Sequence, residues 1–134
     1  MTQQKQKFEV RIVSYQTIQN VVYYKIQTRA SQHGLYDSEK VYSVERRFND
    51  FKALHKHLSG NPAYAGYGIP KLPAEAASWS GWLLGESEEF VRERKTALEV
   101  YLCSVAAKEA LRRDNELFTF LTDCRHESLT PRVP

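Results

Sequence analysis

ERRFNDFKALHKHL, residues 45–58, decides the fold, because a strand ends and a helix begins within this stretch. Residues 41–45 alternate with the two-residue period of a strand. Further on, Phe51, Leu54 and Leu58 recur at helical spacing, so we expect that face of the helix to be buried. Asn49 is the expected N-cap, and Asp50 complements the positive end of the helix dipole.

The junction between strand and helix carries Arg46, Arg47 and Phe48. Guanidinium groups are planar, permanently charged forks that match phosphate oxygens. The aromatic ring beside them offers a flat apolar face to a ring-shaped headgroup. Residues 40–58 hold five Lys or Arg against two Asp or Glu, and this local excess suits an anionic ligand. The alternative is that these basic residues are only the solvated end of a strand.

The flanking sequence predicts an α+β fold. Residues 8–18 and 21–31 are rich in β-branched and aromatic residues and are joined by a short turn at Gln19-Asn20, which predicts a hairpin. With the strand at 41–45 they form a three-stranded antiparallel β-meander, which we expect to pack on a helical subdomain. A polar break at residues 59–62 ends the first helix, and Asp114 is a candidate cap for the short closing helices.

A proline-rich loop is predicted between the first two helices. Ile69-Pro70-Lys71-Leu72-Pro73 favours an extended, polyproline-like course. The second long helix is expected to begin near Ser87. Its apolar stripe is predicted at Phe90, Ala97, Leu98, Tyr101, Leu102 and Val105.

Length and composition are those of one ordinary globular domain. The chain has 134 residues, of which 42% are hydrophobic and 26% charged, and its net charge is +3. No apolar run is long enough to span a bilayer, and residues 1–7 lack the apolar region of a signal peptide. Cys103 and Cys124 do not suggest a disulfide framework. We therefore expect a cytoplasmic location.

Three segments in this order resemble the phox-homology (PX) domain family. They are Arg46–Leu58, Pro70–Pro73 and the run FVRERKTALEVYL at residues 90–102. The family consists of phosphoinositide-binding modules of sorting nexins and related trafficking proteins. The resemblance implies a PX domain over residues 8–124. We expect the N-terminus at 1–7 and the tail at 125–134 to be disordered. It also implies membrane targeting through phosphatidylinositol 3-phosphate, peripherally on endosomal membranes.

The resemblance assigns roles to individual residues. Arg47 corresponds to the family's arginine for the 3-phosphate, Phe48 to the aromatic residue that stacks on the inositol ring, and Arg94 to the helix arginine that binds the 4- and 5-hydroxyls. Phe48 is alternatively a core residue. Arg46 and Arg92 are secondary basic residues, because each lies on a different face of its element from Arg47 or Arg94.

One position departs from the family pattern. Family members that bind this lipid usually have a lysine shortly after the proline-rich run, reaching the 1-phosphate, where this chain has Glu75. A carboxylate there replaces attraction by repulsion. Either Lys71 takes over the role, or lipid binding is weak. The alternative function is thus a PX-type protein-interaction module with weak or no lipid binding.

Both tryptophans lie in one uncharged stretch, residues 76–85. In the family, this position between the proline-rich loop and the second helix carries a membrane-inserting loop. Trp prefers the bilayer interface and exposed Leu adds apolar burial in lipid, so we predict insertion. The alternatives are a loop folded back onto the core and a protein-binding patch. The residues expected to insert are Trp79, Trp82, Leu83 and Leu84.

Other classes of function find little support. His55 and His57 are two apart on a helix and make a poor metal pair, and no nucleophile or phosphate-loop motif is present. We therefore expect neither an enzyme, nor a metal site, nor a cofactor. A single-stranded nucleic-acid binder is a further alternative, but the modest basicity and the absence of a basic stripe argue against nucleic acid. A protein partner is compatible with the sequence.

Overall fold

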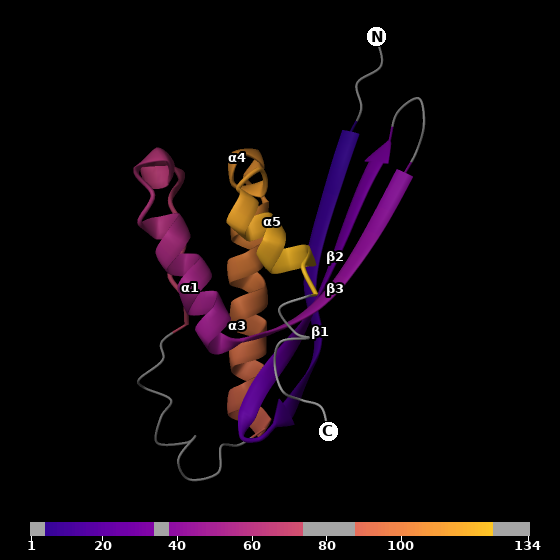
Figure 1. Ribbon diagram of the computed structural model, residues 1–134, viewed down its shortest axis with the longest axis vertical. Coiled ribbons are helices and arrows are strands. Elements are labelled where there is room, and N and C mark those ends of the chain that lie inside the picture. The colour runs from indigo at the N-terminus through magenta and orange to yellow at the C-terminus, as the bar shows by residue number, and fades with distance from the viewer. Residues whose placement is uncertain (1–4, 34–37, 74–87, 125–134) are drawn as a thin grey trace.

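A three-stranded antiparallel sheet and a layer of helices on one of its faces make up the fold (Figure 1). The computed structural model describes residues 5–33, 38–73 and 88–124. The strands are β1 (Lys5–Ile18), β2 (Val21–His33) and β3 (Ser38–Arg47), in the order β1-β2-β3. The predicted α+β meander is therefore confirmed.

β1 is longer than predicted and carries an irregularity. It begins at Lys5 rather than Phe8, so residues 5–7 belong to the sheet and not to a disordered segment. The register with β2 shifts between Ile12 and Ser14. Beside this bulge the Ile12 N–H donates a hydrogen bond of 2.9 Å to the Glu99 carboxylate, which ties the edge of β1 to a helix.

The predicted hairpin turn joins β1 to β2. Its two residues have positive φ angles, 51° at Gln19 and 65° at Asn20, as a tight hairpin requires. Asn adopts this left-handed conformation more readily than most residues, because its short polar side chain can bond to the local backbone. A two-residue turn at Gln19 and Asn20 is therefore consistent with the pairing of Ile18 with Val21 at the ends of the two strands.

α1 (Phe48–Ser59) begins earlier than predicted. The N-cap is Arg47 rather than Asn49, because the Asp50 carboxylate accepts a hydrogen bond of 2.9 Å from the Arg47 N–H. This reach back from the third helical residue is one half of a capping box. As a result, Phe48 is the first residue of the helix and Arg47 lies at the junction itself.

The remaining helices follow the predicted order, with one addition. The 3₁₀ helix η1 (Pro62–Tyr67) was not predicted, and the Asn61 side chain caps it by accepting from the Ala63 N–H. Residues 68–73 have no regular secondary structure, in keeping with the proline-rich loop. Then come α3 (Glu88–Ala106), α4 (Glu109–Arg112) and α5 (Asn115–Thr122).

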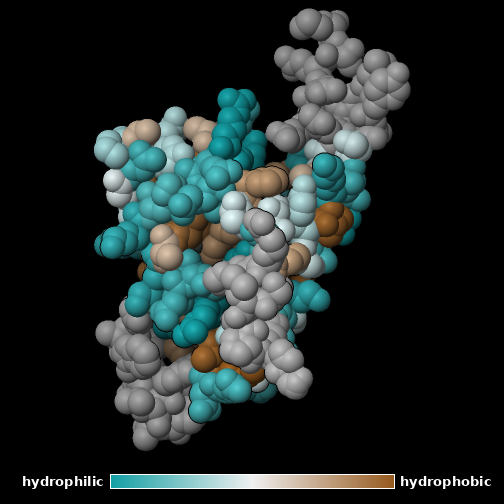
Figure 2. All heavy atoms as spheres, in the orientation of Figure 1, coloured by the Kyte–Doolittle hydropathy of each residue, from teal (hydrophilic) through white to brown (hydrophobic). Residues whose placement is uncertain are grey.

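The core lies between the inner face of the sheet and the helices. In the view of Figure 2, hydrophilic side chains cover much of the helices, and apolar ones show mainly in the spaces between the elements. At the centre of the core, Phe51 of α1 packs edge-to-face against Tyr24 of β2 and Phe120 of α5, with ring centroids 6.3 and 5.0 Å apart. Leu54 and Leu58 are buried with Phe51, as predicted.

α3 supplies the other large share of the core. Its buried residues include four of the predicted stripe and add two others. Together they are Val91, Leu98, Tyr101, Leu102, Val105 and Ala106.

The described residues include neither a membrane-spanning helix nor a metal-binding cluster. None of the described helices combines the length and the hydrophobicity that crossing a bilayer requires. Within the same residues, no three His, Cys, Asp or Glu side chains gather in a way that would hold a metal ion. Cys103 and Cys124 are free thiols.

Asp114 joins the helices at one end of the molecule. As predicted, it is the N-cap of α5, and its carboxylate accepts from the Glu116 and Leu117 N–H groups. The same carboxylate binds the His57 Nε2 at 2.9 Å and the Tyr64 hydroxyl at 2.5 Å. One buried side chain thus holds α1, η1 and α5 together.

This network shifts the pKa values of Tyr64 and Asp114. The hydrogen bond to Asp114 is the main reason why the pKa of Tyr64 rises to about 12. Burial, the largest single contribution, raises the pKa of Asp114, but the hydrogen bonds from Tyr64, His57 and the α5 backbone outweigh it together and lower that pKa. Because the folded-state pKa is the lower one, the network stabilises the fold above an ordinary Asp pKa of about 3.9 and is lost as the pH falls through the folded value.

Asp114→Ala should therefore destabilise the protein by about 2 to 3 kcal/mol at neutral pH, because a helix cap is lost and two half-buried side chains lose their acceptor. Urea unfolding at a series of pH values measures this effect. The difference from the parent should shrink as the pH falls below about 4. Glu109→Ala, which removes an exposed carboxylate, is the control and should change stability little. A pH-independent difference would contradict the assigned network.

Candidate functional site

The candidate site begins where β3 passes into α1. Arg47, the last residue of β3, is half-buried, and among the described residues its guanidinium makes no hydrogen bond or ion pair. Phe48, the first residue of α1, is partly buried and packs against the core. Phe48 thus supports the fold with part of its side chain, as the alternative of a core residue expects, and its stacking on a headgroup stays a prediction.

Arg94 of α3 joins this junction. Its guanidinium carbon lies 4.0 Å from the centroid of the Phe48 ring and 4.9 Å from that of Phe90. Phe90 and Arg94 are four residues apart, so they share one face of α3. Cation–π contacts of this kind contribute about 0.5 to 2 kcal/mol. The stack brings together two predicted site residues that are far apart in the sequence.

Two other predicted basic residues, Arg92 and Lys71, have exposed side chains and make no side-chain hydrogen bond, ion pair or ring contact, among the described residues, with the cluster of Arg47, Phe48, Phe90 and Arg94. Arg92 is exposed, two residues from Arg94 and so on a different face of α3. Lys71 is exposed on the segment 68–73, which Ile69 and Leu72 anchor to the core. Within the described part of the chain, no hydrogen bond or ion pair connects Lys71 to the cluster.

Arg46 has a structural environment. Only 3% of its surface is exposed, and its guanidinium donates to the backbone carbonyls of Glu45, Thr119 and Asp123 at 2.8 to 3.2 Å. It also lies 5.4 Å from the centroid of the Phe120 ring. Arg46 therefore neutralises the carbonyl end of α5 and attaches this helix to β3. The guanidinium of Arg46 is thus taken up by contacts within the fold.

Phe90, the remaining residue of the cluster, was predicted only as part of the apolar stripe of the second long helix. Its spacing of four residues from Arg94 was the available signal. Several predicted residues, in contrast, fall outside the described ones, because they lie between residues 74 and 87. They are Glu75 and the expected inserting residues Trp79, Trp82, Leu83 and Leu84.

Two features together describe this protein. The last strand of a three-stranded meander ends in an arginine that is followed by an aromatic ring at the start of a helix, and a second helix places another arginine over that ring. The sequence model described as "PX domain" matches residues 35–124, which is more than half of the chain. The chain belongs to the PX domain family.

The relatives of the chain include sorting nexins. The chain is 33% identical over 111 residues to vacuolar protein sorting-associated protein vps5 of Schizosaccharomyces pombe, in a match that covers 82% of the chain and 17% of that protein. It is 34% identical over 103 residues to sorting nexin-2 of Homo sapiens, with coverage of 73% and 20%. The chain therefore spans about a fifth of the length of these relatives.

Solved structures agree with the fold. An X-ray structure of a designed CISK-PX domain superposes with a TM-score of 0.66 at 26% identity, covering 84% of this chain and 97% of that one. The mouse SNX19 PX domain with a bound sulphate ion has a TM-score of 0.61 at 17% identity, covering 90% and 97%. At that lower identity the likeness concerns the fold alone.

The buried guanidinium of Arg46 should contribute strongly to stability. Arg46→Gln should lower the free energy of unfolding by about 3 kcal/mol, because the shorter amide cannot reach the carbonyls that the guanidinium satisfies. Thermal unfolding measures the loss. Arg29→Gln is the matched control, since Arg29 lies on the sheet in an exposed ion pair with Glu39 and its loss should cost little. Equal melting temperatures for the two variants would show that Arg46 does not hold α5.

Proposed function

We propose that this PX domain binds phosphatidylinositol 3-phosphate on endosomal membranes and so holds the protein there. The observation that carries the proposal is the stack of Arg94 on Phe48 at 4.0 Å. It places one arginine and one aromatic ring beside Arg47, whose guanidinium has no partner within the described residues. A 3-phosphorylated inositol needs a cation for the phosphate, a flat apolar surface for the ring and donors for the free hydroxyls.

Arg47 is the group for the 3-phosphate. A phosphate monoester carries between one and two negative charges near neutral pH, and a guanidinium binds two of its oxygens at once. Arg47 is the N-cap of α1, so the positive end of that helix dipole lies at the same point and favours an anion. Because no carboxylate of the described residues is paired with this guanidinium, phosphate binding breaks no ion pair among them.

Arg94 and the inositol ring would both pack on the Phe48 ring, so headgroup binding affects the position of Arg94. A guanidinium lying over one face of the ring cannot also reach hydroxyls stacked on the other face. We therefore infer that headgroup binding moves Arg94 off the Phe48 ring. Phe90 stays beside it, 4.9 Å away in the free protein, and limits how far the guanidinium swings. The guanidinium N–H groups then donate to the 4- and 5-hydroxyls.

Lys71 and Glu75 decide the strength of binding in this proposal. Lys71 is exposed and carries the charge that the 1-phosphate needs, whereas Glu75 repels it. The alternative function, a PX-type protein-interaction module with weak lipid binding, follows if Lys71 does not compensate. Binding to a panel of phosphoinositide vesicles separates the two functions.

Membrane insertion is the second half of the proposal. The sequence supports it through two interfacial tryptophans and two leucines in an uncharged stretch. Headgroup binding then makes the interaction specific, and the inserted apolar side chains slow dissociation from the membrane. The side chains that enter the bilayer after headgroup capture are Trp79, Trp82, Leu83 and Leu84.

Arg47→Gln should abolish sedimentation with vesicles that contain phosphatidylinositol 3-phosphate, because the phosphate loses its bidentate partner. Thermal unfolding should stay near that of the parent, since the guanidinium has no partner in the described part of the fold. The parent should prefer these vesicles to those with phosphatidylinositol or its 4-phosphate. If Arg47→Gln binds as the parent does, the assignment of Arg47 to the 3-phosphate is wrong. A parent that binds no vesicle of the panel would favour the protein-interaction module instead.

The double variant Trp82→Ala/Leu83→Ala separates headgroup recognition from insertion. It should keep the parent's affinity for a soluble short-chain phosphatidylinositol 3-phosphate, measured by calorimetry, because the pocket is unchanged. Its affinity for vesicles with the same headgroup should fall more than about tenfold, since burying one large apolar side chain contributes roughly 1.5 to 3 kcal/mol. Unfolding several degrees below the parent would instead place these side chains in the core and refute insertion.

A further inference from the structure

A concave surface lies toward the end of the sheet opposite the candidate site at Arg47. It is a cleft of about 450 Å³ between the first half of β3, the adjoining parts of β1 and β2, and the helices α4 and α5. Its floor is one row of the sheet, in which Phe8 pairs with Ala30 and Ala30 with Lys40. A volume of this size accommodates a small ligand or a few side chains of a peptide.

The cleft exists because the strands extend beyond their helical cover. Figure 1 shows the upper parts of all three strands diverging from α4 and α5. These two helices have only four and eight residues. At about 1.5 Å per residue they cover a short length of strands that rise about 3.3 Å per residue. The inner face of the sheet is therefore left open next to the helices.

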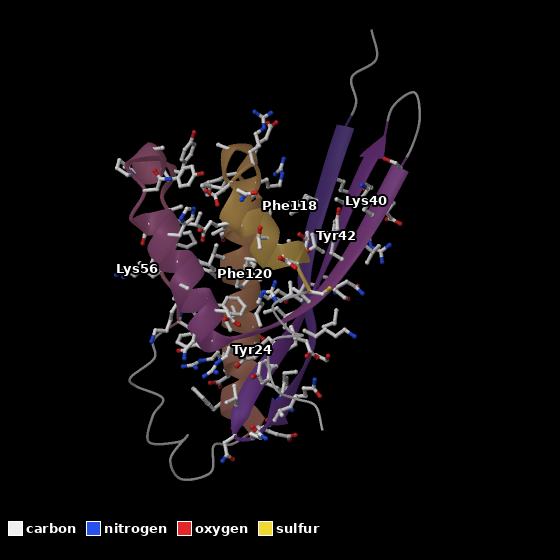
Figure 3. All side chains as sticks on the ribbon, viewed as in Figure 1. Tyr24, Lys40, Tyr42, Lys56, Phe118 and Phe120 are labelled. Carbon is white, nitrogen blue, oxygen red and sulfur yellow. The ribbon has the colours of Figure 1, made fainter. Side chains whose placement is uncertain are left out.

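The walls of the cleft are aromatic. Phe118 of α5 is 48% exposed, and it lies edge-to-face with Tyr42 of β3 at a centroid distance of 6.2 Å. Figure 3 shows Phe118 and Tyr42 close together between α5 and β3, with Lys40 beyond them along the strand. A half-exposed Phe next to a hollow is unlike its neighbour Phe120, which is buried in the core. The aromatic pair presents an apolar surface for an aliphatic or aromatic side chain.

The charges of the cleft are mainly positive. Three cationic residues line it, namely Lys40, Arg112 and Arg113, against one carboxylate, Glu109. Arg113 is paired with Glu109 at 2.8 Å. Arg112 donates one N–H to a backbone carbonyl, and its guanidinium lies 5.6 Å from the centroid of the Phe8 ring, with no carboxylate partner in the described residues. Lys40 is exposed. Two positive charges thus remain for a ligand.

We propose that this cleft binds a peptide of a partner protein in which acidic residues flank an aromatic or large aliphatic side chain. The apolar side chain packs against Phe118 and Tyr42, and the carboxylates pair with Lys40 and Arg112. Charge complementarity and the aromatic wall select this chemistry. A lipid headgroup is less suited, since Phe8, Tyr42 and Phe118 give the lining around the two cations a large aromatic share.

The cleft is far from the candidate lipid site. Lys40 and Arg47 are seven residues apart on β3, which corresponds to roughly 23 Å along a strand. The proposed peptide therefore does not compete with a headgroup at Arg47. A protein held on a membrane through Arg47 keeps the cleft available to a partner, so the two proposals fail or succeed separately.

Selection from a phage library of random dodecapeptides tests the proposal without assuming a particular partner. The expected consensus is an aromatic or large aliphatic residue flanked by Asp or Glu. A synthetic peptide with that consensus, labelled with fluorescein, should shift the amide resonances of residues lining the cleft, and its affinity should fall with added salt. A basic consensus, no enrichment, or shifts confined to other residues would overturn the proposal.

Two lysines provide the matched variants. Lys40→Glu should weaken binding of the labelled peptide about tenfold or more, because an attraction becomes a repulsion. Lys56→Glu makes the same change at an exposed lysine of α1 outside the cleft (Figure 3) and should leave binding unchanged. Phe118→Ser should also weaken binding. Equal affinities for the two lysine variants would refute the site.

Vesicle sedimentation of the same variants distinguishes the two sites. Lys40→Glu should keep the parent's binding to vesicles that contain phosphatidylinositol 3-phosphate, whereas Arg47→Gln should keep the parent's binding to the peptide. If Lys40→Glu loses vesicle binding, the cleft is a lipid site and the peptide proposal is overturned. Loss of vesicle binding by Arg47→Gln alone, with no peptide selected by the parent, would support the lipid site and refute the cleft.

Discussion

The hydrogen bond from the Arg47 N–H to the Asp50 carboxylate determines where the sheet becomes a helix. It makes Arg47 the cap and Phe48 the first residue of α1, so the cap lies two residues before the expected one at Asn49. With α1 started there, Phe51 is buried in the core, and Phe48 stays at its edge within reach of α3. A helix capped by Asn49 would have left Phe48 before the helix instead of opening it.

The strand that leads into this junction gives two adjacent arginines opposite tasks. Successive side chains of a strand point to opposite faces, so Arg46 enters the interior while Arg47 stays nearer the surface. Arg46 is buried among carbonyls of β3 and the α5 end, where a charge without partners would be costly. Arg47 has no such partners in the described residues, so its charge is available to the anion of the proposed function. The proposed site thus separates stability, at Arg46, from recognition, at Arg47, within two residues.

Periodicity and turn chemistry predicted much of the fold, since they depend on neighbouring residues. The buried face of α1 and the cap at Asp114 are examples. Contacts between distant segments were not predictable in this way. The carbonyl partners of Arg46 and the stack of Arg94 on Phe48 depend on how α3 and α5 pack. The start of α1 was misplaced because Asn49 is a good local cap, whereas the Asp50 side chain in the first turn of the helix binds back to the Arg47 N–H.

The length of the strands has a consequence for the whole domain. A sheet only as long as its helices would bury its inner face completely. Here the strands extend past α4 and α5, and the uncovered row ends in Lys40, near the opposite end of β3 from Arg47. Because β3 is paired along its length with β2, it is a stiff spacer between these two ends. A ligand at one end therefore leaves the other end in place, which is the geometry that simultaneous binding of a membrane and a partner requires.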